Sequence, residues 1–155
     1  MGQLIDRVLL VPQKIIPVPG GDVLHALRCS GEGFAGFGEA YFSQVTPGAT
    51  KAWKRHRLMT LNLVVPVGRV AIGVVDMDAR RGRIYELGLE SYSRLTIPPG
   101  LWAGFRGIAA ETSLMLNVAN IEHDPEESDC MSEAAFGFSW DAPPFPLGSD
   151  QDIRR

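Results

Sequence analysis

The feature that most constrains this chain is a succession of short runs rich in β-branched and aromatic residues, separated by glycine and proline turn signals. These runs occupy residues 8–16 (interrupted by Pro12), 23–27, 39–45, 61–67, 70–76, 84–89, 93–97 and 114–119. Helical periodicity is weak throughout. About eight short strands at such close spacing predict a β-sandwich or a closed barrel. Gly68 and Arg69, between two of the runs, indicate a tight hairpin.

The length and composition indicate one domain. A chain of 155 residues with 45% apolar content has enough apolar side chains to build a single core. The 17 glycines and 11 prolines suit a fold with many turns. We therefore expect a β domain over residues 1–141, followed by a Pro-rich extended tail over residues 142–155 whose last residues are disordered.

Charge and hydropathy exclude several kinds of partner. The net charge of −3 provides no basic face for a nucleic acid, although a small anionic ligand needs only a few local cations. No apolar run is long enough for a spanning helix, and no secretory signal is visible near the start. Cys29 and Cys130 form no CxxC pair, which fits a reducing compartment. We expect a cytoplasmic protein with no membrane partner.

The densest polar group in this acidic chain lies in residues 47–62. It surrounds Trp53 with Lys51, Lys54, Arg55, His56 and Arg57. In an extended strand Lys54 and His56 share one face, and Lys51 and Trp53 share the other. The first face would line a pocket if it points into a barrel. The alternative is a solvated basic stretch at a sheet edge, where lysines discourage further strand pairing.

A second polar cluster covers residues 120–129 and includes Glu122, His123 and Asp124. Such side chains are found in metal sites, but a structural site needs about four ligands arranged by the fold. We interpret this segment as an acidic loop and expect no bound metal. The sequence contains none of the GxSxG, HExxH or kinase signatures.

Four segments together resemble the dTDP-4-dehydrorhamnose 3,5-epimerase family, in order along most of the chain. They are GEAYFSQVTPGATKAWKRH at 38–56, NLVVPVGRVAIGVVDMD at 62–78, LTIPPGLWAGF at 95–105 and NIEHDPEESD at 120–129. The resemblance implies a mainly β, cupin-like jelly-roll barrel and a homodimer without metal or cofactor. It also implies a substrate that is a nucleotide-linked 4-keto-6-deoxy sugar, with dTDP as the expected nucleotide.

The family's chemistry is proton abstraction next to a ketone. A histidine backed by an aspartate removes the proton, a lysine stabilises the enolate, and a tyrosine reprotonates the other face. The family motif G-x-x-R-G-x-H matches residues 48–54, so Lys51 stands at the diphosphate-contacting arginine and Lys54 at the catalytic histidine. Asn62 falls where the lysine is expected, and Ala103 replaces a histidine.

The resemblance leaves two assignments of the base open. In one, Lys54 is the base, with its pKa lowered by burial and by neighbouring cations. In the other, which we favour, His56 is the base and Lys54 supplies positive charge near the oxyanion. Tyr41, on a neighbouring strand, is the candidate third catalytic residue. The expected substrate-binding residues are Lys51, Trp53, Glu39, Ser43 and Asn62.

The expected function is therefore an epimerase or isomerase of a nucleotide-linked 4-keto-6-deoxy sugar, in the biosynthesis of a polysaccharide or a decorated metabolite. The alternative is an inactive epimerase-like barrel that binds a nucleotide sugar or regulates a partner enzyme. A third reading is a different reaction on a related substrate, such as epimerisation at one centre or a 3,4-keto shift.

Overall fold

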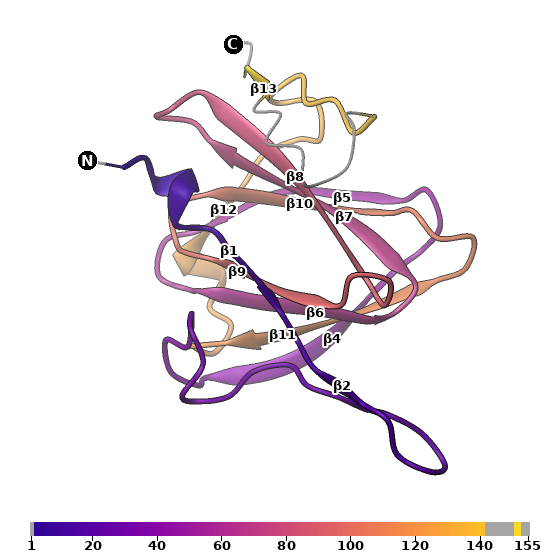
Figure 1. Ribbon diagram of the computed structural model, residues 1–155. Coiled ribbons are helices and arrows are strands. Elements are labelled where there is room, and N and C mark those ends of the chain that lie inside the picture. The colour runs from indigo at the N-terminus through magenta and orange to yellow at the C-terminus, as the bar shows by residue number, and fades with distance from the viewer. Residues whose placement is uncertain (1, 142–150, 153–155) are drawn as a thin grey trace.

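The computed structural model describes residues 2–141 and 151–152, which form two antiparallel sheets facing each other (Figure 1). The five-stranded sheet has the order β1 (Leu9–Pro12), β9 (Ser93–Ile97), β6 (Leu61–Val67), β11 (Ser113–Ala119) and β4 (Glu39–Val45). The six-stranded sheet has the order β12 (Ser128–Cys130), β5 (Thr50–His56), β10 (Trp102–Gly107), β7 (Arg69–Asp76), β8 (Arg81–Gly88) and β13 (Gln151–Asp152). The predicted mainly β architecture is confirmed.

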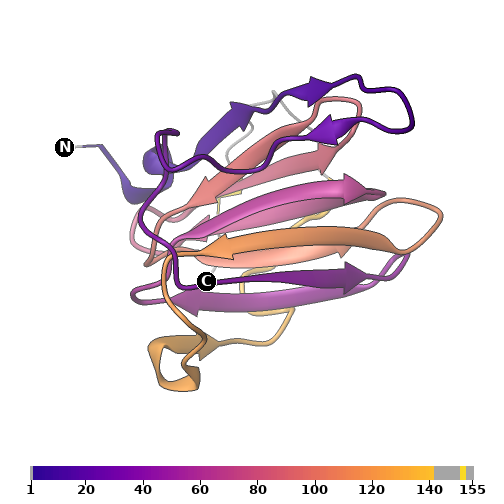
Figure 2. The same ribbon diagram turned by 90° about the horizontal axis from the view of Figure 1, so that it is seen from below.

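Few other elements accompany the two sheets. Two short 3-10 helices, η1 (Leu4–Arg7) and η2 (Pro125–Glu127), lie outside them, and β2 (Ile15–Ile16) pairs with β3 (Val23–Leu24) in a separate ribbon. Figure 2 shows this ribbon and its connecting loop at the margin of the barrel, beyond the main sheets. No helix among residues 2–141 and 151–152 is long and apolar enough to cross a membrane.

The core lies between the two sheets because alternate residues of each strand point inward. On β6 these are Leu61, Leu63 and Val65, and on β7 they are Val70, Ile72 and Val74; all six are buried. Burial of each such side chain contributes about 1.5–3 kcal/mol to folding. The branched residues that predict strands in the sequence are therefore the same ones that hold the two sheets together.

The connection at Gly68 differs from its prediction. The strands β6 and β7 on either side belong to different sheets and do not pair, so Gly68 is a corner between sheets and the predicted hairpin is wrong. Gly68 has a φ of 79°, and a Cβ there would lie 2.2 Å from the Ser113 hydroxyl oxygen. That hydroxyl accepts from the Arg69 N–H at 3.0 Å and donates to the Arg69 carbonyl at 3.0 Å.

The segment after β12 covers the outer face of the six-stranded sheet. Phe136, Phe138 and Trp140 pack there against Trp53 and Trp102, forming an outer aromatic cluster separate from the main core. Most of the predicted tail, residues 142–150 and 153–155, lies outside the described residues. Within it, Gln151 and Asp152 pair with β8.

Candidate active site

A cavity of about 470 Å³ opens between the two sheets, and it is the natural place for a ligand in this fold. The six-stranded sheet supplies one wall and the five-stranded sheet the other. The lining residues are Glu39, Tyr41, Ser43, Lys54, His56, Leu61, Leu63, Ala103, Phe105, Met115, Asn117 and His123. The cavity therefore combines an apolar floor with a small set of ionisable and hydrogen-bonding groups.

Lys54 and His56 reach this cavity because alternate residues of β5 face inward, as the sequence predicts. An irregularity then changes the alternation toward the start of the strand. Ala103 pairs with Lys54 and Phe105 with Lys51, so three steps along β5 oppose two along β10. The extra residue turns Lys51 to the same side as the cavity-lining Phe105. This corrects the prediction that Lys51 shares a face with Trp53.

Lys51 itself lies beyond the residues that line the cavity. Its side chain is exposed, and its ammonium donates to the carbonyl of Gln44 on the opposite sheet at 3.4 Å. Lys51 thus bridges β5 and β4, and leaves a positive charge accessible from solvent.

His56 is paired with the carboxylate of Glu127. The side chains are both buried, and His56 Nδ1 is hydrogen-bonded to Glu127 Oε1. Because Nδ1 is occupied by this bond, Nε2 is the ring nitrogen left for a ligand. The pairing of Ser128 with His56 in β12 and β5 brings the two side chains together.

The second carboxylate oxygen of Glu127 is also occupied. Glu127 Oε2 accepts from the backbone N–H groups of Arg57 at 3.1 Å, Leu58 at 3.0 Å and Met59 at 3.3 Å. Burial raises the pKa of Glu127, but the bonds from His56 and these backbone groups outweigh it and hold the pKa below its ordinary value of 4.5. The ionised carboxylate therefore fixes the orientation of the imidazole.

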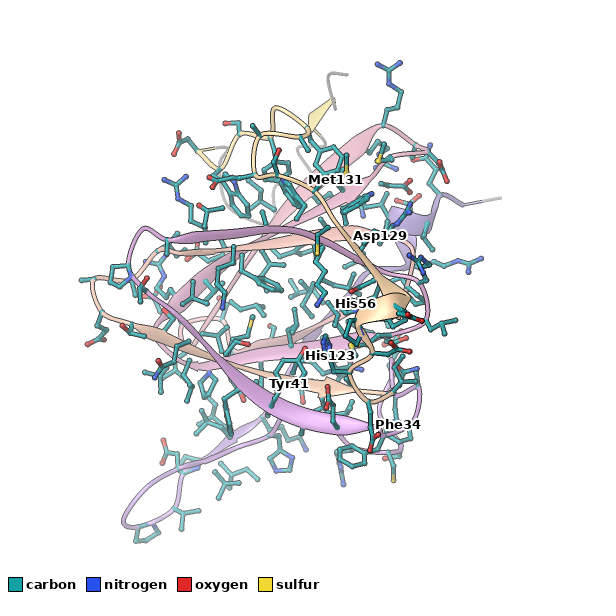
Figure 3. All side chains as sticks on the ribbon, turned by 180° about the vertical axis from the view of Figure 1, so that it is seen from behind. Phe34, Tyr41, His56, His123, Asp129 and Met131 are labelled. Atoms are coloured by element: carbon teal, nitrogen blue, oxygen red, sulfur yellow. The ribbon has the colours of Figure 1, made fainter. Side chains whose placement is uncertain are left out.

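Tyr41 lies on the opposite wall, on β4. The Asn117 side-chain amide donates to the Tyr41 hydroxyl oxygen at 3.0 Å, and Asn117 Oδ1 accepts from the backbone N–H of Asn62 at 3.0 Å. The Tyr41 hydroxyl proton is thus available to a ligand. Figure 3 shows Tyr41, His123 and His56 near one another, consistent with their shared place in the cavity lining.

Glu39 adds an unsatisfied group to the same wall. Its Oε1 atom is buried and has no hydrogen-bond partner among the described residues, while the residue lines the cavity. A buried acceptor without a partner is costly, so this atom is suited to a hydroxyl or N–H donor on a ligand. Ser43, four residues further along β4, lines the cavity on the same face.

Comparison with known proteins identifies the family of this chain. The solved structure of a dTDP sugar isomerase from Desulfovibrio desulfuricans G20 is 36% identical, has a TM-score of 0.84, and is matched over 92% of this chain and 96% of that one. The chain belongs to the dTDP-4-dehydrorhamnose 3,5-epimerase-like family of sugar-nucleotide epimerases and isomerases.

A curated relative matches part of the chain, and a second solved structure shares its fold. The probable low-salt glycan biosynthesis epimerase Agl13 of Haloferax volcanii is 30% identical over 96 residues, and the match spans 58% of this chain and 62% of that relative, less than two thirds of its length. No protein-family model matches the chain. The RmlC epimerase of Legionella pneumophila, at 17% identity and a TM-score of 0.72, shares the fold, and the predicted cupin-like jelly roll is confirmed.

Two residues expected to bind the sugar nucleotide, Trp53 and Asn62, have side chains outside the lining of this cavity. Trp53 is 2% exposed, lies in the outer aromatic cluster and donates from Nε1 to the Glu133 carbonyl at 3.1 Å. Asn62 points to the outer face, where its amide donates to the Gly33 carbonyl at 3.2 Å and its oxygen accepts from Thr96 at 2.6 Å.

The positions on β6 that face the cavity are Leu61 and Leu63. The side chain of Asn62 therefore does not take the place of the family's enolate-stabilising lysine, and Lys54 is the one lysine or arginine that lines the cavity in the described part of the chain. The lysine side chain in the cavity lining therefore comes from β5, and β6 contributes leucines.

The sequence analysis did not identify three residues of this site. Glu127 pairs with His56, and His123 and Asn117 line the cavity. Glu127 and His123 lie in the segment interpreted as an acidic loop. The resemblance of residues 120–129 to a family motif was the signal that this segment returns to the site. Among the described residues, no group of three or more His, Cys, Asp or Glu is placed to hold a metal ion.

Proposed function

We propose that this protein is an epimerase or isomerase of a nucleotide-linked 4-keto-6-deoxy sugar, acting by proton abstraction next to the ketone. The observation that carries the proposal is the buried His56–Glu127 pair facing the cavity beside Lys54. A carboxylate-backed imidazole is a general base, and an ammonium close to it suits a developing oxyanion. The family relationship supports a sugar nucleotide as the substrate class.

The first step belongs to His56. Its Nε2 lone pair takes the proton from the carbon next to the ketone, and the C–H electrons form a carbon–carbon double bond. The carbonyl π electrons move to oxygen, giving an enolate and an imidazolium. Glu127 stabilises that imidazolium because its carboxylate is ionised and bonded to Nδ1.

Lys54 stabilises the enolate oxygen. It lies two residues from His56 on the same strand face, so both side chains enter the cavity from one wall. The neighbouring floor, formed by Leu61, Leu63 and Phe105, keeps water away and strengthens the attraction between ammonium and enolate.

Tyr41 delivers a proton to the opposite face of the enolate. It stands on β4, in the wall across from His56, and its hydroxyl oxygen already accepts from Asn117. Transfer of the phenolic proton to carbon restores the ketone with inverted configuration. Solvent then reprotonates the phenolate and removes the proton from His56, which completes the cycle.

The remaining assignments concern the nucleotide. Lys51, with its exposed ammonium, contacts the diphosphate, and Glu39 and Ser43 accept or donate hydrogen bonds to the bound sugar nucleotide. dTDP is the proposed nucleotide. The proposal requires no metal or cofactor, and includes a homodimer located in the cytoplasm, as expected from the family resemblance.

A second candidate reaction is a 3,4-keto shift. Lys54 and His56 occupy one wall together, which suits transfer of a proton between adjacent carbons along a single face of the sugar. The sugar 3,4-ketoisomerase QdtA of Thermoanaerobacterium thermosaccharolyticum has a related fold, with a TM-score of 0.67 and 21% identity.

The test is incubation with dTDP-4-keto-6-deoxyglucose in deuterium oxide, followed by NMR. Deuterium at C3 and C5 with inverted centres supports 3,5-epimerisation, deuterium at C3 alone supports one-centre epimerisation, and a 3-keto product supports the keto shift. Exchange no faster than in a His56→Ala variant contradicts the catalytic proposal. Thermal stabilisation by dTDP without exchange assigns the protein to binding or regulation instead.

A further inference from the structure

A second, smaller cavity of about 170 Å³ lies on the outer side of the five-stranded sheet and shares no lining residue with the barrel cavity. Its polar lining comes from three parts of the chain: Gln13 and Lys14 before β2, His25, Arg28 and Glu32 after β3, and Arg94 on β9. Neither the family relationship nor the proposed reaction uses these residues.

Arg94 is a buried cation that forms no salt bridge among the described residues. It is 3% exposed, and its side chain points away from the core that its neighbour Leu95 enters. Its guanidinium donates to the carbonyls of Ala26, at 3.2 Å, and Glu32. Both acceptors are neutral dipoles, and within the described residues Arg94 forms no salt bridge. Burial lowers the pKa of Arg94, and the Glu32 carboxylate opposes this. Burying an unpaired charge is costly.

Lys14 and Arg28 add two more cations to the same cavity. In the part of the chain that the structure describes, neither they nor His25 makes a side-chain hydrogen bond or ion pair. The backbone holds Lys14 and His25 near each other, because the His25 N–H donates to the Lys14 carbonyl at 2.9 Å. Three permanent cations thus face one carboxylate, Glu32, in a protein whose net charge is −3.

We propose that this cavity binds a phosphoryl group, either as inorganic phosphate or as the terminal phosphate of a larger molecule. Arginine donors match the oxygens of a phosphate in paired hydrogen bonds, and lysine adds a point charge. With about 170 Å³ against about 470 Å³ in the barrel, the cavity suits a phosphoryl group and not an entire sugar nucleotide.

The bound anion neutralises Arg94 and joins three segments that otherwise repel one another. One of them, the loop carrying Arg28 and Glu32, continues directly into β4, where Glu39 and Tyr41 line the barrel cavity. Anion binding therefore stabilises the loop that leads into the catalytic wall, independently of the reaction proposed there.

The experiment is calorimetric titration of the full chain with inorganic phosphate, at an ionic strength held constant with chloride so that screening does not change. The expected result is saturable binding that weakens about tenfold or more in Arg28→Ala and in Lys14→Ala. The matched control is Arg7→Ala, an exposed arginine of η1 outside the cavity, which leaves the phosphate affinity unchanged.

A second titration distinguishes inorganic phosphate from the terminal phosphate of a larger molecule, and the outer cavity from the barrel cavity. A parallel titration with dTDP, in a Lys51→Gln background that weakens nucleotide binding at the barrel cavity, tests whether a nucleotide's terminal phosphate also reaches the outer cavity. Weaker binding of either ligand in Arg28→Ala supports the proposal. No saturable phosphate binding, or phosphate binding that Lys51→Gln abolishes and Arg28→Ala leaves intact, overturns it. Arg28→Ala and Lys14→Ala leave the buried Arg94 in place, so the experiment does not depend on an Arg94 substitution that prevents folding.

Discussion

The imidazole of His56 and the carboxylate of Glu127 are 71 residues apart in sequence, yet Nδ1 of one is hydrogen-bonded to Oε1 of the other inside the protein. The edge strand β12 makes this contact possible. It pairs with β5 from Ser128 to Cys130, and Arg55 bonds to Asp129 at 2.8 Å next to the dyad. The end of the cavity that carries His56 is therefore held by a short strand and an ion pair.

Glu127→Gln is expected to lower the rate of proton exchange by about 100-fold, because the imidazolium loses its ionised partner. Nucleotide binding changes little, since Glu127 does not line the cavity. Deuterium incorporation and dTDP affinity measure the two effects. The control is Glu126→Gln at an exposed neighbouring position. Equal rates in the two variants would remove the dyad from the mechanism.

Lys54→Gln is expected to reduce kcat by about 10²–10³-fold, the usual cost of losing one group that stabilises an oxyanion. KM changes less, because the charge on the oxygen develops only in the transition state. Steady-state kinetics separate these parameters. A pure KM effect would instead place Lys54 on the nucleotide.

Lys51→Gln is expected to show the opposite pattern. Its exposed ammonium is bonded to the Gln44 carbonyl, and we propose that it contacts the diphosphate and not the reacting carbon. KM for the nucleotide sugar rises about tenfold with kcat nearly unchanged. Affinity for free dTDP, measured by calorimetry, falls in parallel. A large loss of kcat contradicts this assignment.

Trp53→Ala is expected to destabilise the fold by about 3–5 kcal/mol, because it empties the centre of the outer aromatic cluster. At temperatures where the variant stays folded, KM remains close to the wild-type value, since Trp53 lies outside the cavity. Urea unfolding measures the stability. Phe42→Ala, at a side chain 62% exposed, serves as the comparison and changes it by less than about 0.5 kcal/mol.

The stability of the protein is expected to fall in acid. Hydrogen bonds and attraction from Arg57 and Arg55 lower the pKa of Asp129 from 3.8 to about 2, and the pKa of Glu127 is also lowered. The unfolded chain then binds more protons, so these groups contribute fully above about pH 4.5 and lose their contribution toward pH 2. Thermal unfolding across this range measures the slope, which Asp129→Asn flattens. An unchanged slope in that variant excludes this ion pair as a source.

Local patterns predicted the strands well. The expected runs at 39–45, 61–67 and 93–97 coincide with β4, β6 and β9. The inward placement of Lys54 and His56 followed from simple alternation along β5. Such features depend on steric preferences and on the two-residue period of a strand, both of which are written in neighbouring residues.

Predictions that depended on strand partners were less successful. Gly68 joins two sheets and not two paired strands, and the extra residue of β5 opposite β10 moved Lys51 to a face that strict alternation does not predict. Asn62 turned outward, so its backbone N–H, and not its side chain, supports the site through Asn117. Each outcome is determined by a neighbour distant in sequence.

The sequence by itself determined a β domain of the sugar-nucleotide epimerase type and the strand face that carries Lys54 and His56, because residue propensity and alternation act over a few positions. Only the tertiary structure decided that Glu127 backs His56, that Tyr41 faces them from the other wall, and that Arg94 shares a cavity with Lys14 and Arg28. These contacts arise when strands from separate parts of the chain pair and stack, and the residues involved carry no local signal of that pairing.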